Sequence, residues 1–189
     1  VGGGMAGRDL AHGAWLDVRP GWLTAGDRLL EDLVHEVPWQ AERRQMYDSV
    51  VDVPRLTRFY AEGEPLPRPI LAQARDALSA HYAGELGEPF TTAGMCLYRD
   101  GRDSVAWHGD RIGRSREQDT MIAIVSLGAD RPLSLRPRDG GASIKVAAGH
   151  GDLVVMGGSC QRTWDHAILK TSAVVGPRIS VQFRVSGVR

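Results

Sequence analysis

The sequence predicts an α+β protein built on a jelly roll, the double-stranded β-helix, with helices toward the N-terminus. From about residue 92 onward, eight short apolar segments alternate with turns, a density typical of a double-sheet jelly roll. Residues 1–90 instead combine polar loops with two segments of helical periodicity. We expect a single domain over residues 1–189, with helices and a lid over about 1–92 and the jelly-roll core over about 93–186.

Two helices are predicted before the strands begin. The first opens near Thr24-Ala25-Gly26-Asp27, which resembles a capping box, and carries Leu29, Leu30, Leu33 and Val34 at helical spacing. The second begins at Pro67, and Pro69 lies in its first turn, where a missing N–H is tolerated. Between them, residues 38–65 mix arginines with aromatic residues, and we expect short strands and loops there.

The eight predicted strands are bounded by turn residues. They are Ala93–Tyr98, Val105–His108, Met121–Leu127, Leu133–Leu135, Ser143–Val146, Asp152–Met156, Thr163–Ala167 and Ile179–Val185.

Composition restricts the function classes only weakly. Lys+Arg and Asp+Glu both total 23, and a net charge of zero neither suggests nor excludes a nucleic-acid partner, because a local basic face is sufficient. No segment approaches the roughly 20 apolar residues of a membrane span, so no membrane contact is expected. The two cysteines, Cys96 and Cys160, are expected to be free thiols, which favours a cytoplasmic location.

A metal site is predicted from His108, Asp110 and the later His166. Residues two apart on a strand project from one face, so His108 and Asp110 can hold one ion together. Two imidazoles and one carboxylate with open positions are the ligand set of non-heme Fe(II) oxygenases. A His-x-Asp pair alone is weak evidence, whereas a later strand histidine in the same order makes the set specific.

Two arginines six residues apart, Arg178 and Arg184, lie on the last predicted strand. Six strand residues span about 20 Å, and even spacing places both side chains on one face. Guanidinium groups hold carboxylates through two parallel hydrogen bonds, so this pair suits the two ends of a small dicarboxylate.

These motifs together resemble the AlkB family. The matching segments are residues 97–110, 125–128, 150–158, 164–166 and 178–184, with a thinner match over 36–63. The resemblance implies an Fe(II)- and 2-oxoglutarate-dependent dioxygenase that uses O2 to demethylate nucleobases, releasing succinate, CO2 and formaldehyde. It makes His108, Asp110 and His166 the iron ligands, and it assigns Tyr98, Arg178 and Arg184 to 2-oxoglutarate.

Three positions depart from the family pattern. The family's Asn-x-Tyr reads Cys96-Leu97-Tyr98, and its Arg-x-Asn-x-x-x-Arg carries Ser180 in place of asparagine. We expect Cys96 and Ser180 to alter hydrogen bonding around the cosubstrate without abolishing its site. Ile112 stands where relatives often place an acidic residue that reads the target base.

The resemblance also implies a nucleotide-recognition lid over residues 38–60. We expect a flipped base to lie between Tyr60 and His108, Arg43 and Arg44 to contact flanking phosphates, and Trp39 to contribute to substrate binding. The expected substrate is alkylated single- or double-stranded DNA, with RNA as an alternative, and the expected state is a monomer.

Other readings stay open at the level of sequence. The chain could be a related oxygenase acting on a protein or small molecule, or a non-catalytic nucleic-acid binder on the same fold. Asp165 is expected to be structural, because it projects away from the face that carries His166. The arginines of the loop 110–120 (Arg111, Arg114 and Arg116) either are solvated or contact phosphates.

Overall fold

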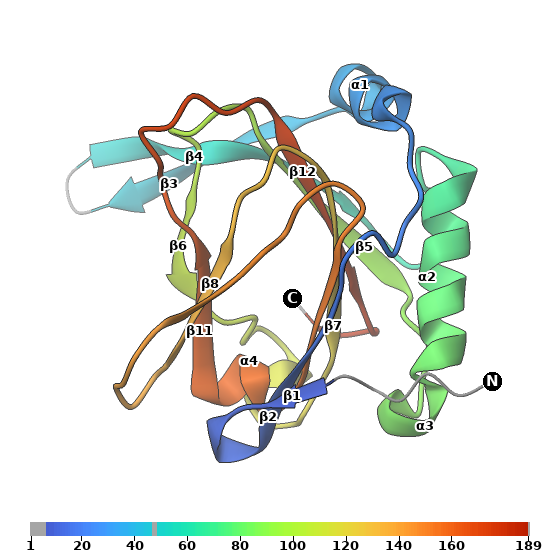
Figure 1. The fold of residues 1–189 in the computed structure, drawn as a ribbon, viewed down its shortest axis with the longest axis vertical. Helices are drawn as coiled ribbons and strands as arrows, with labels where there is room; N and C mark the ends of the chain where they lie inside the picture. Colours follow the sequence, from blue (N-terminus) through green and yellow to red (C-terminus); the bar gives the residue numbers. More distant parts are fainter. Residues whose placement is uncertain (1–6, 47–48, 189) are drawn as a thin grey trace.

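The computed structural model describes residues 7–46 and 49–188, and for residues 44–46 and 49–52 it describes the backbone alone. Within these ranges the strands form an eight-stranded major sheet and a four-stranded minor sheet that enclose a barrel (Figure 1). This arrangement confirms the predicted jelly roll.

The major sheet has the order β1-β2-β10-β7-β12-β5-β4-β3, and all its pairings are antiparallel. Its strands are β1 (Gly7–Asp9), β2 (Ala14–Arg19), β3 (Gln40–Met46), β4 (Ser49–Tyr60), β5 (Thr92–Tyr98), β7 (Ile122–Gly128), β10 (Leu153–Gly158) and β12 (Arg178–Arg184).

The minor sheet has the order β6-β11-β8-β9 and is also antiparallel. Its strands are β6 (Val105–His108), β8 (Leu133–Pro137), β9 (Ile144–Val146) and β11 (Trp164–Ile168). All eight strands predicted for the second half of the chain are therefore present, within a few residues of their expected bounds.

Helices cover the outside of the major sheet. The two longest are α1 (Asp27–Glu36) and α2 (Pro69–His81), and α2 runs along the sheet on one side of the barrel (Figure 1). The second predicted helix thus begins two residues later than expected, with Pro69 at its start. Short turns of helix complete the described chain: η1 (Ala11–Gly13), α3 (Ala83–Leu86), η2 (Arg114–Arg116) and α4 (Cys160–Thr163).

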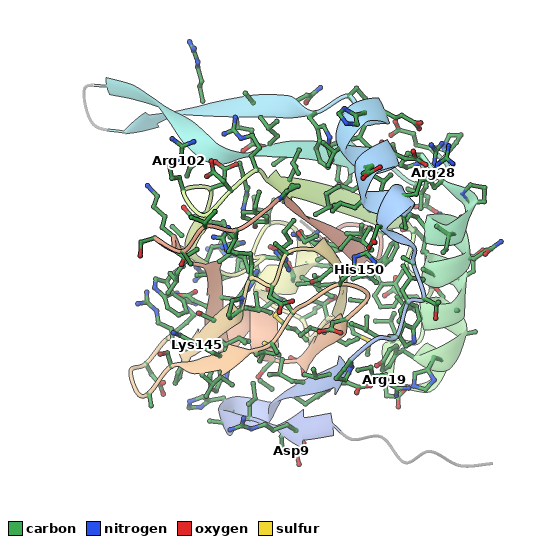
Figure 2. All side chains as sticks on the ribbon, turned by 45° about the horizontal axis from the view of Figure 1, so that its top comes forward. Asp9, Arg19, Arg28, Arg102, Lys145 and His150 are labelled. Carbon is green, nitrogen blue, oxygen red and sulfur yellow. The ribbon has the colours of Figure 1, made fainter. Side chains whose placement is uncertain are left out.

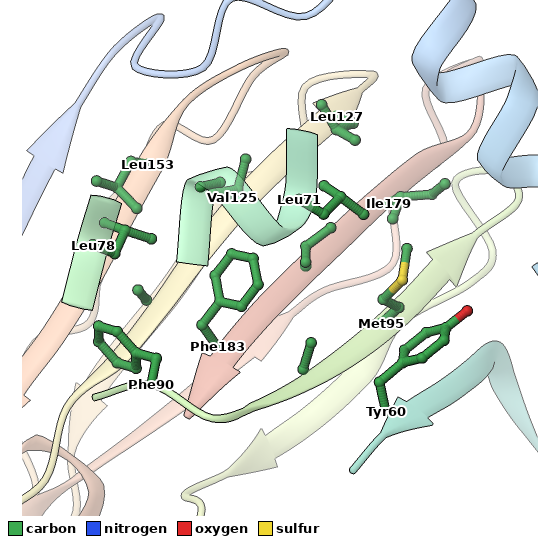
Figure 3. Close-up of a cluster of buried hydrophobic side chains, with 14 of the residues drawn as sticks. Tyr60, Leu71, Leu78, Phe90, Met95, Val125, Leu127, Leu153, Ile179 and Phe183 are labelled. Atoms are coloured by element: carbon green, nitrogen blue, oxygen red, sulfur yellow. The ribbon is translucent and has the colours of Figure 1, made fainter. Parts of the chain in front are cut away.

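Strand pleating divides the interior into two apolar clusters, one on each face of the major sheet. On β12, Ile179, Val181 and Phe183 face the helices and belong to the larger cluster (Figure 3). The alternate positions of this strand, including Arg178 and Ser180, line a cavity inside the barrel. A strand whose barrel-facing positions are polar rather than apolar marks the side of the sheet on which a site is built.

Two parts of the first half differ from the expectation. Residues 40–46 and 49–60 form two long antiparallel strands, β3 and β4, rather than short strands and loops; β4 pairs with β3 between residues 49 and 57 and with β5 over residues 56–60. Residues 7–19 were not predicted as strands, yet β1 and β2 extend the major sheet beside β10. Ala14 and Leu16 alternate inward on β2, but a strand this short is stabilised chiefly by its distant partner β10.

The structure also bears on the expected lack of a membrane span and on the two cysteines. Among the described residues, no helix has both the length and the apolar character needed to cross a membrane. Cys96 and Cys160 are both buried and unpaired with each other, as expected for free thiols. Burial raises the pKa of the Cys160 thiol to about 12, so it stays protonated and unreactive at neutral pH.

Candidate active site

A cavity of about 280 Å³ lies inside the barrel, between the two sheets. Among the residues that line it are all the predicted metal ligands and cosubstrate residues: Cys96, Tyr98, His108, Asp110, His166, Arg178, Ser180 and Arg184. Its charged lining residues are three arginines and one aspartate, which leaves the cavity with a net charge of plus two when its histidines are neutral. Such a cavity suits an anion.

The three predicted metal ligands converge in this cavity. One ligand atom from each of His108, Asp110 and His166 lies within 4.8 Å of the others. Antiparallel pairing of β6 and β11 places His166 directly opposite His108, and their ring centroids are 4.3 Å apart. The strand β6 ends at His108, so Asp110 lies just beyond it, where its backbone N–H donates to Gln161 Oε1 at 2.9 Å.

The protonation states suit a divalent metal. Burial, reinforced by the nearby His108, lowers the pKa of His166 to about 3, and burial also lowers the pKa of His108. Both imidazoles are therefore neutral at pH 7 and can donate a lone pair. Burial by itself would raise the pKa of Asp110, but Arg184 and His166 hold it below its ordinary value, so the carboxylate is ionised.

The orientation of the His108 ring is fixed by the backbone. Its Nδ1 lies 2.8 Å from the carbonyl oxygen of Ala106. Because a carbonyl only accepts hydrogen bonds, Nδ1 carries the proton and Nε2 presents its lone pair to the site.

Gly109 allows the two ligands on either side of it to approach the same ion. A Cβ atom at this position would lie 2.7 Å from the carbonyl oxygen of Gln161 and 3.3 Å from that of Trp164. Any side chain at residue 109 would therefore push the β6 end away from β11 and separate the ligand set.

Arg178 lines the same cavity and is buried, with only 1% of its surface exposed. Its Nη2 donates to Ser126 Oγ at 2.8 Å, whereas Nε and Nη1 have no hydrogen-bond partner. Burial lowers the pKa of this guanidinium. Beside it, burial raises the pKa of Tyr98 to about 12, so the phenol keeps its proton and can donate it. Unsatisfied buried donors of this kind are costly and call for an acceptor supplied by a ligand.

Arg184 lies at the metal end of the cavity. Its Nε donates to Asp110 Oδ2 at 2.5 Å, and its Nη2 donates to Gln182 Oε1 at 2.6 Å. The two arginines of β12 are thus not equivalent: Arg178 has donors without partners, while Arg184 orients a metal ligand. The prediction that Arg184 also contacts the cosubstrate stays a prediction.

The two departures at Cys96 and Ser180 are neighbours, because these residues pair directly across β5 and β12. Gln182 reaches both of them, with Nε2 at 3.0 Å from Ser180 Oγ and 3.6 Å from Cys96 Sγ. One glutamine amide therefore links two short side chains and, through its Oε1, holds Arg184 against Asp110. Apart from its even spacing from Arg178, no sequence signal distinguishes Gln182.

Two further arginines went unrecognised in the sequence. Arg55 of β4 lines the cavity, and its Nε has no hydrogen-bond partner; alternation with Leu56 could have placed it there. Arg131 is 2% exposed and donates to the carbonyl oxygens of Asp100, Asp103 and Leu169 at 2.8–2.9 Å. It ties loops together behind Tyr98, and no local sequence signal identifies it.

Two predicted substrate residues lie away from the cavity. Tyr60 is 5% exposed and packs with Leu71 and Met95 in the cluster under the helices, on the opposite face of the major sheet from His108 (Figure 3). Its ring cannot form one side of a base sandwich with His108, so that prediction is wrong. Trp39 packs against the same cluster and donates its indole N–H toward the carbonyl oxygens of Leu33 and Val34, so it anchors α1 rather than binding substrate.

The remaining predicted substrate residues lie on the hairpin and at the cavity mouth. Arg43 is exposed on β3, where it pairs with Asp52 of β4 across a register shift. The side chain of Arg44 lies outside the described residues. Ile112 lines the cavity and is 69% exposed. It therefore places an apolar side chain at the rim, at the position where we expect relatives to carry an acidic one.

The described residues fit both groups that the family resemblance implies. Two neutral imidazoles and one ionised carboxylate within reach of one point match the donor set of Fe(II). The unpaired Nε and Nη1 of Arg178 leave charged donors free for a carboxylate of 2-oxoglutarate. O2, the third expected reactant, needs only an open metal position, which a three-residue ligand set leaves.

Comparison with known proteins agrees with this geometry. Residues 42–184 match the family model of the 2OG-Fe(II) oxygenase superfamily. The chain is 31% identical over 185 residues to alpha-ketoglutarate-dependent dioxygenase alkB homolog 3 of Bos taurus, covering 86% of this chain and 62% of that protein. It is 26% identical over 181 residues to DNA oxidative demethylase ALKBH2 of Homo sapiens, covering 84% and 67%. The chain thus spans about three fifths of the alkB homolog 3 protein.

Solved structures show the same fold. The structure of OsALKBH1 superposes with a TM-score of 0.63 at 13% identity, covering 95% of this chain and 99% of that one. A prolyl hydroxylase from Trichoplax adhaerens gives 0.64, also at 13% identity, covering 89% and 82%. Together with the matching ligand set and the buried arginine, the sequence relatives identify this chain as a member of the AlkB family within the 2OG-Fe(II) oxygenase superfamily.

Proposed function

We propose that this chain is an Fe(II)- and 2-oxoglutarate-dependent dioxygenase that removes alkyl groups from nucleobases, with DNA as its expected substrate. The observation that carries the proposal is the pairing of a metal-ligand set with a buried arginine whose donors have no partner. A structural metal site needs no such arginine, whose unsatisfied donors are costly unless a ligand supplies an acceptor.

When bound, Fe(II) and 2-oxoglutarate supply oxidative chemistry in which O2 converts the cosubstrate to succinate and CO2 and hydroxylates an N-alkyl carbon, which leaves as an aldehyde. The protein residues provide position. His108, Asp110 and His166 would hold the ion, and Arg178 with the protonated Tyr98 would hold a carboxylate of the cosubstrate. Arg184 keeps Asp110 oriented and ionised, so that the carboxylate of Asp110 can bind a metal ion instead of a proton.

The substrate class is inferred from the relatives and from the shape of the cavity. Relatives carry the name DNA oxidative demethylase, and the enclosed cavity can accept a base only after it leaves the stack. The apolar rim at Ile112 offers no charge to a cationic base, so we expect little discrimination among methylated bases and acceptance of neutral adducts. RNA is the alternative polymer.

The test measures succinate and formaldehyde released from single-lesion DNA and RNA oligonucleotides, single- and double-stranded, under Fe(II) and ascorbate. We expect succinate and formaldehyde to form in equal amounts with a methylated strand. His108→Ala and Asp110→Ala should abolish both products, whereas His35→Ala, which removes an exposed imidazole on α1, should change neither.

Two results would contradict the proposal in different ways. Undiminished turnover in either ligand variant would refute the metal assignment. Consumption of 2-oxoglutarate without repair of any oligonucleotide would refute the nucleobase assignment and favour a protein or small-molecule substrate.

A further inference from the structure

The outer face of the minor sheet carries a concentration of basic side chains. His166 and Leu135 pair across β11 and β8 and face the barrel, so the adjacent cross-strand pair, Asp165 and Arg136, faces outward. On β9, Lys145 alternates with the inward Ile144 and also faces outward (Figure 2). We call the following set the basic face: Trp107, Arg111, Arg136, Arg138 and Lys145.

One aspartate cannot neutralise this set. Asp165 lies 3.6 Å from Arg111 Nη2, 3.8 Å from Arg138 Nε and 3.9 Å from Arg136 Nη2, all longer than a hydrogen bond. The buried Oδ1 of Asp165 has no hydrogen-bond partner, so none of the arginine N–H groups donates a hydrogen bond to it. Three arginines and one aspartate leave two net positive charges, and Lys145 adds a third. The arginine side chains are 34–45% exposed and thus accessible to an anion.

An aromatic ring holds part of this charge in place. The guanidinium of Arg136 lies over the indole of Trp107, 4.4 Å from the ring centroid, and the tryptophan itself is only half-buried. Stacking of this kind fixes the planar fork of an arginine, which is well suited to phosphate. Arginine charge next to an accessible aromatic ring is the combination that binds single-stranded nucleic acid.

The basic face is continuous with the active site. Trp107 precedes the ligand His108, Asp165 precedes His166, and Arg111 follows Asp110, so the two surfaces are opposite faces of the same strands. Ile112, the next residue after Arg111, lines the cavity mouth. A strand with one base in the cavity can therefore pass Arg111 and continue across β11 and β8.

We propose that the basic face binds the sugar–phosphate backbone of a single-stranded nucleic acid on one side of the base held in the cavity. This inference rests on the proposed function and adds a polymer-binding site to it. It predicts that the basic face acts only on substrates long enough to leave the cavity.

The test compares a methylated trinucleotide with a fifteen-residue strand carrying the same central lesion. The variant Arg136→Ser/Arg138→Ser removes two charges from the basic face. The matched control, Arg28→Ser/Arg75→Ser, removes two charges from α1 and α2 on the far side of the major sheet. Binding is measured by fluorescence anisotropy over a range of salt concentrations, and turnover of the trinucleotide by succinate release.

The basic-face variant should bind the long strand more weakly, and its salt slope should fall by about 1.4, which is roughly 0.7 for each lost contact with a single strand. Its turnover of the trinucleotide should stay unchanged, and the control should keep wild-type behaviour on both substrates. Asp165→Asn should strengthen binding of the long strand, a gain that misfolding does not produce.

Three outcomes would overturn the inference: no weakening on the long strand, equal weakening on both lengths, or equal weakening in the control. If the wild-type protein turns over the methylated trinucleotide in any of these cases, the proposed function stands and the basic face alone is wrong. If the wild-type protein neither binds nor repairs any methylated strand, both proposals fail.

Discussion

Replacing Arg178 with methionine should make the ligand-free protein no less stable while removing its affinity for 2-oxoglutarate. In the ligand-free state, Arg178 is 1% exposed and leaves Nε and Nη1 without partners. Each unsatisfied buried donor costs about 1–3 kcal/mol, and methionine fills a similar volume without donors. Loss of the contact to Ser126 Oγ offsets part of this gain, so we expect the free energy of unfolding to stay level or rise by about 1–2 kcal/mol.

The effect on the cosubstrate has the opposite sign. A hydrogen bond to a charged group contributes about 1.5–3 kcal/mol, and Arg178 can make two to one carboxylate. Methionine should therefore weaken 2-oxoglutarate binding by at least about 3 kcal/mol, or roughly 150-fold. Arg178→Lys keeps the charge but not the fork, and we expect a KM for 2-oxoglutarate raised at least about tenfold.

Arg131 provides the matched control, because it is equally buried but donates to the backbone oxygens of Asp100, Asp103 and Leu169. Arg131→Met should lower the free energy of unfolding by about 3 kcal/mol or more. Stability is measured by urea unfolding with a chelator present, and cosubstrate affinity by anaerobic calorimetry. If Arg178→Met destabilises the ligand-free protein as much as Arg131→Met, or leaves 2-oxoglutarate affinity intact, the argument from unsatisfied donors is refuted.

Three other predictions address the site and its support. Gln182→Leu removes one of the two hydrogen-bond partners of Arg184 and should weaken metal affinity about 10- to 100-fold by titration, whereas Gln182→Glu should retain most of that affinity. If Gln182→Leu bound the metal as tightly as the wild-type protein, Gln182 would not act on Asp110 through Arg184. Tyr60→Ala should lower stability by about 3–5 kcal/mol in urea while 2-oxoglutarate binds normally, whereas a stable variant with weakened base binding would restore the stacking role. The pKa of His166 is about 3 when folded and about 6.5 when unfolded, so its stabilising contribution is complete above pH 6.5 and is lost as pH falls toward 3. Between pH 7.5 and 5 the metal-free protein should lose about 2 kcal/mol from this group, a loss that should be absent in His166→Gln.

Local pattern was sufficient to predict the barrel and the candidate metal ligands. The eight strands of the second half are short segments bounded by turn residues, and most are largely apolar, a pattern visible in a few consecutive residues without knowledge of any partner. Period-two alternation in Arg178–Arg184 put four polar residues, Arg178, Ser180, Gln182 and Arg184, on one face. Because β12 pairs with β5 and β7 along its whole length, that face coincides with the interior of the barrel.

Substrate contacts were harder to predict, because they depend on how distant strands align. Tyr60 pairs with Ala93 on β5, and this register sends its ring to the helical side of the sheet. A shift of one residue would have sent it toward the cavity, and nothing within residues 56–60 decides between the two. Arg55 reached the cavity through the same register.

Sequence alone thus determined the jelly-roll class, the family, the candidate metal ligands His108, Asp110 and His166, and the arginines of the last strand; the burial of Arg178 came from the tertiary structure. Tertiary structure alone decided the edge strands β1 and β2, the link from Gln182 to Asp110 through Arg184, and the basic face around Asp165. The physical reason is range. Alternation and motif spacing are properties of a few consecutive residues and can be read from one segment of the sequence. A hydrogen bond or a charge cluster between strands forms only after the register of the sheets is set.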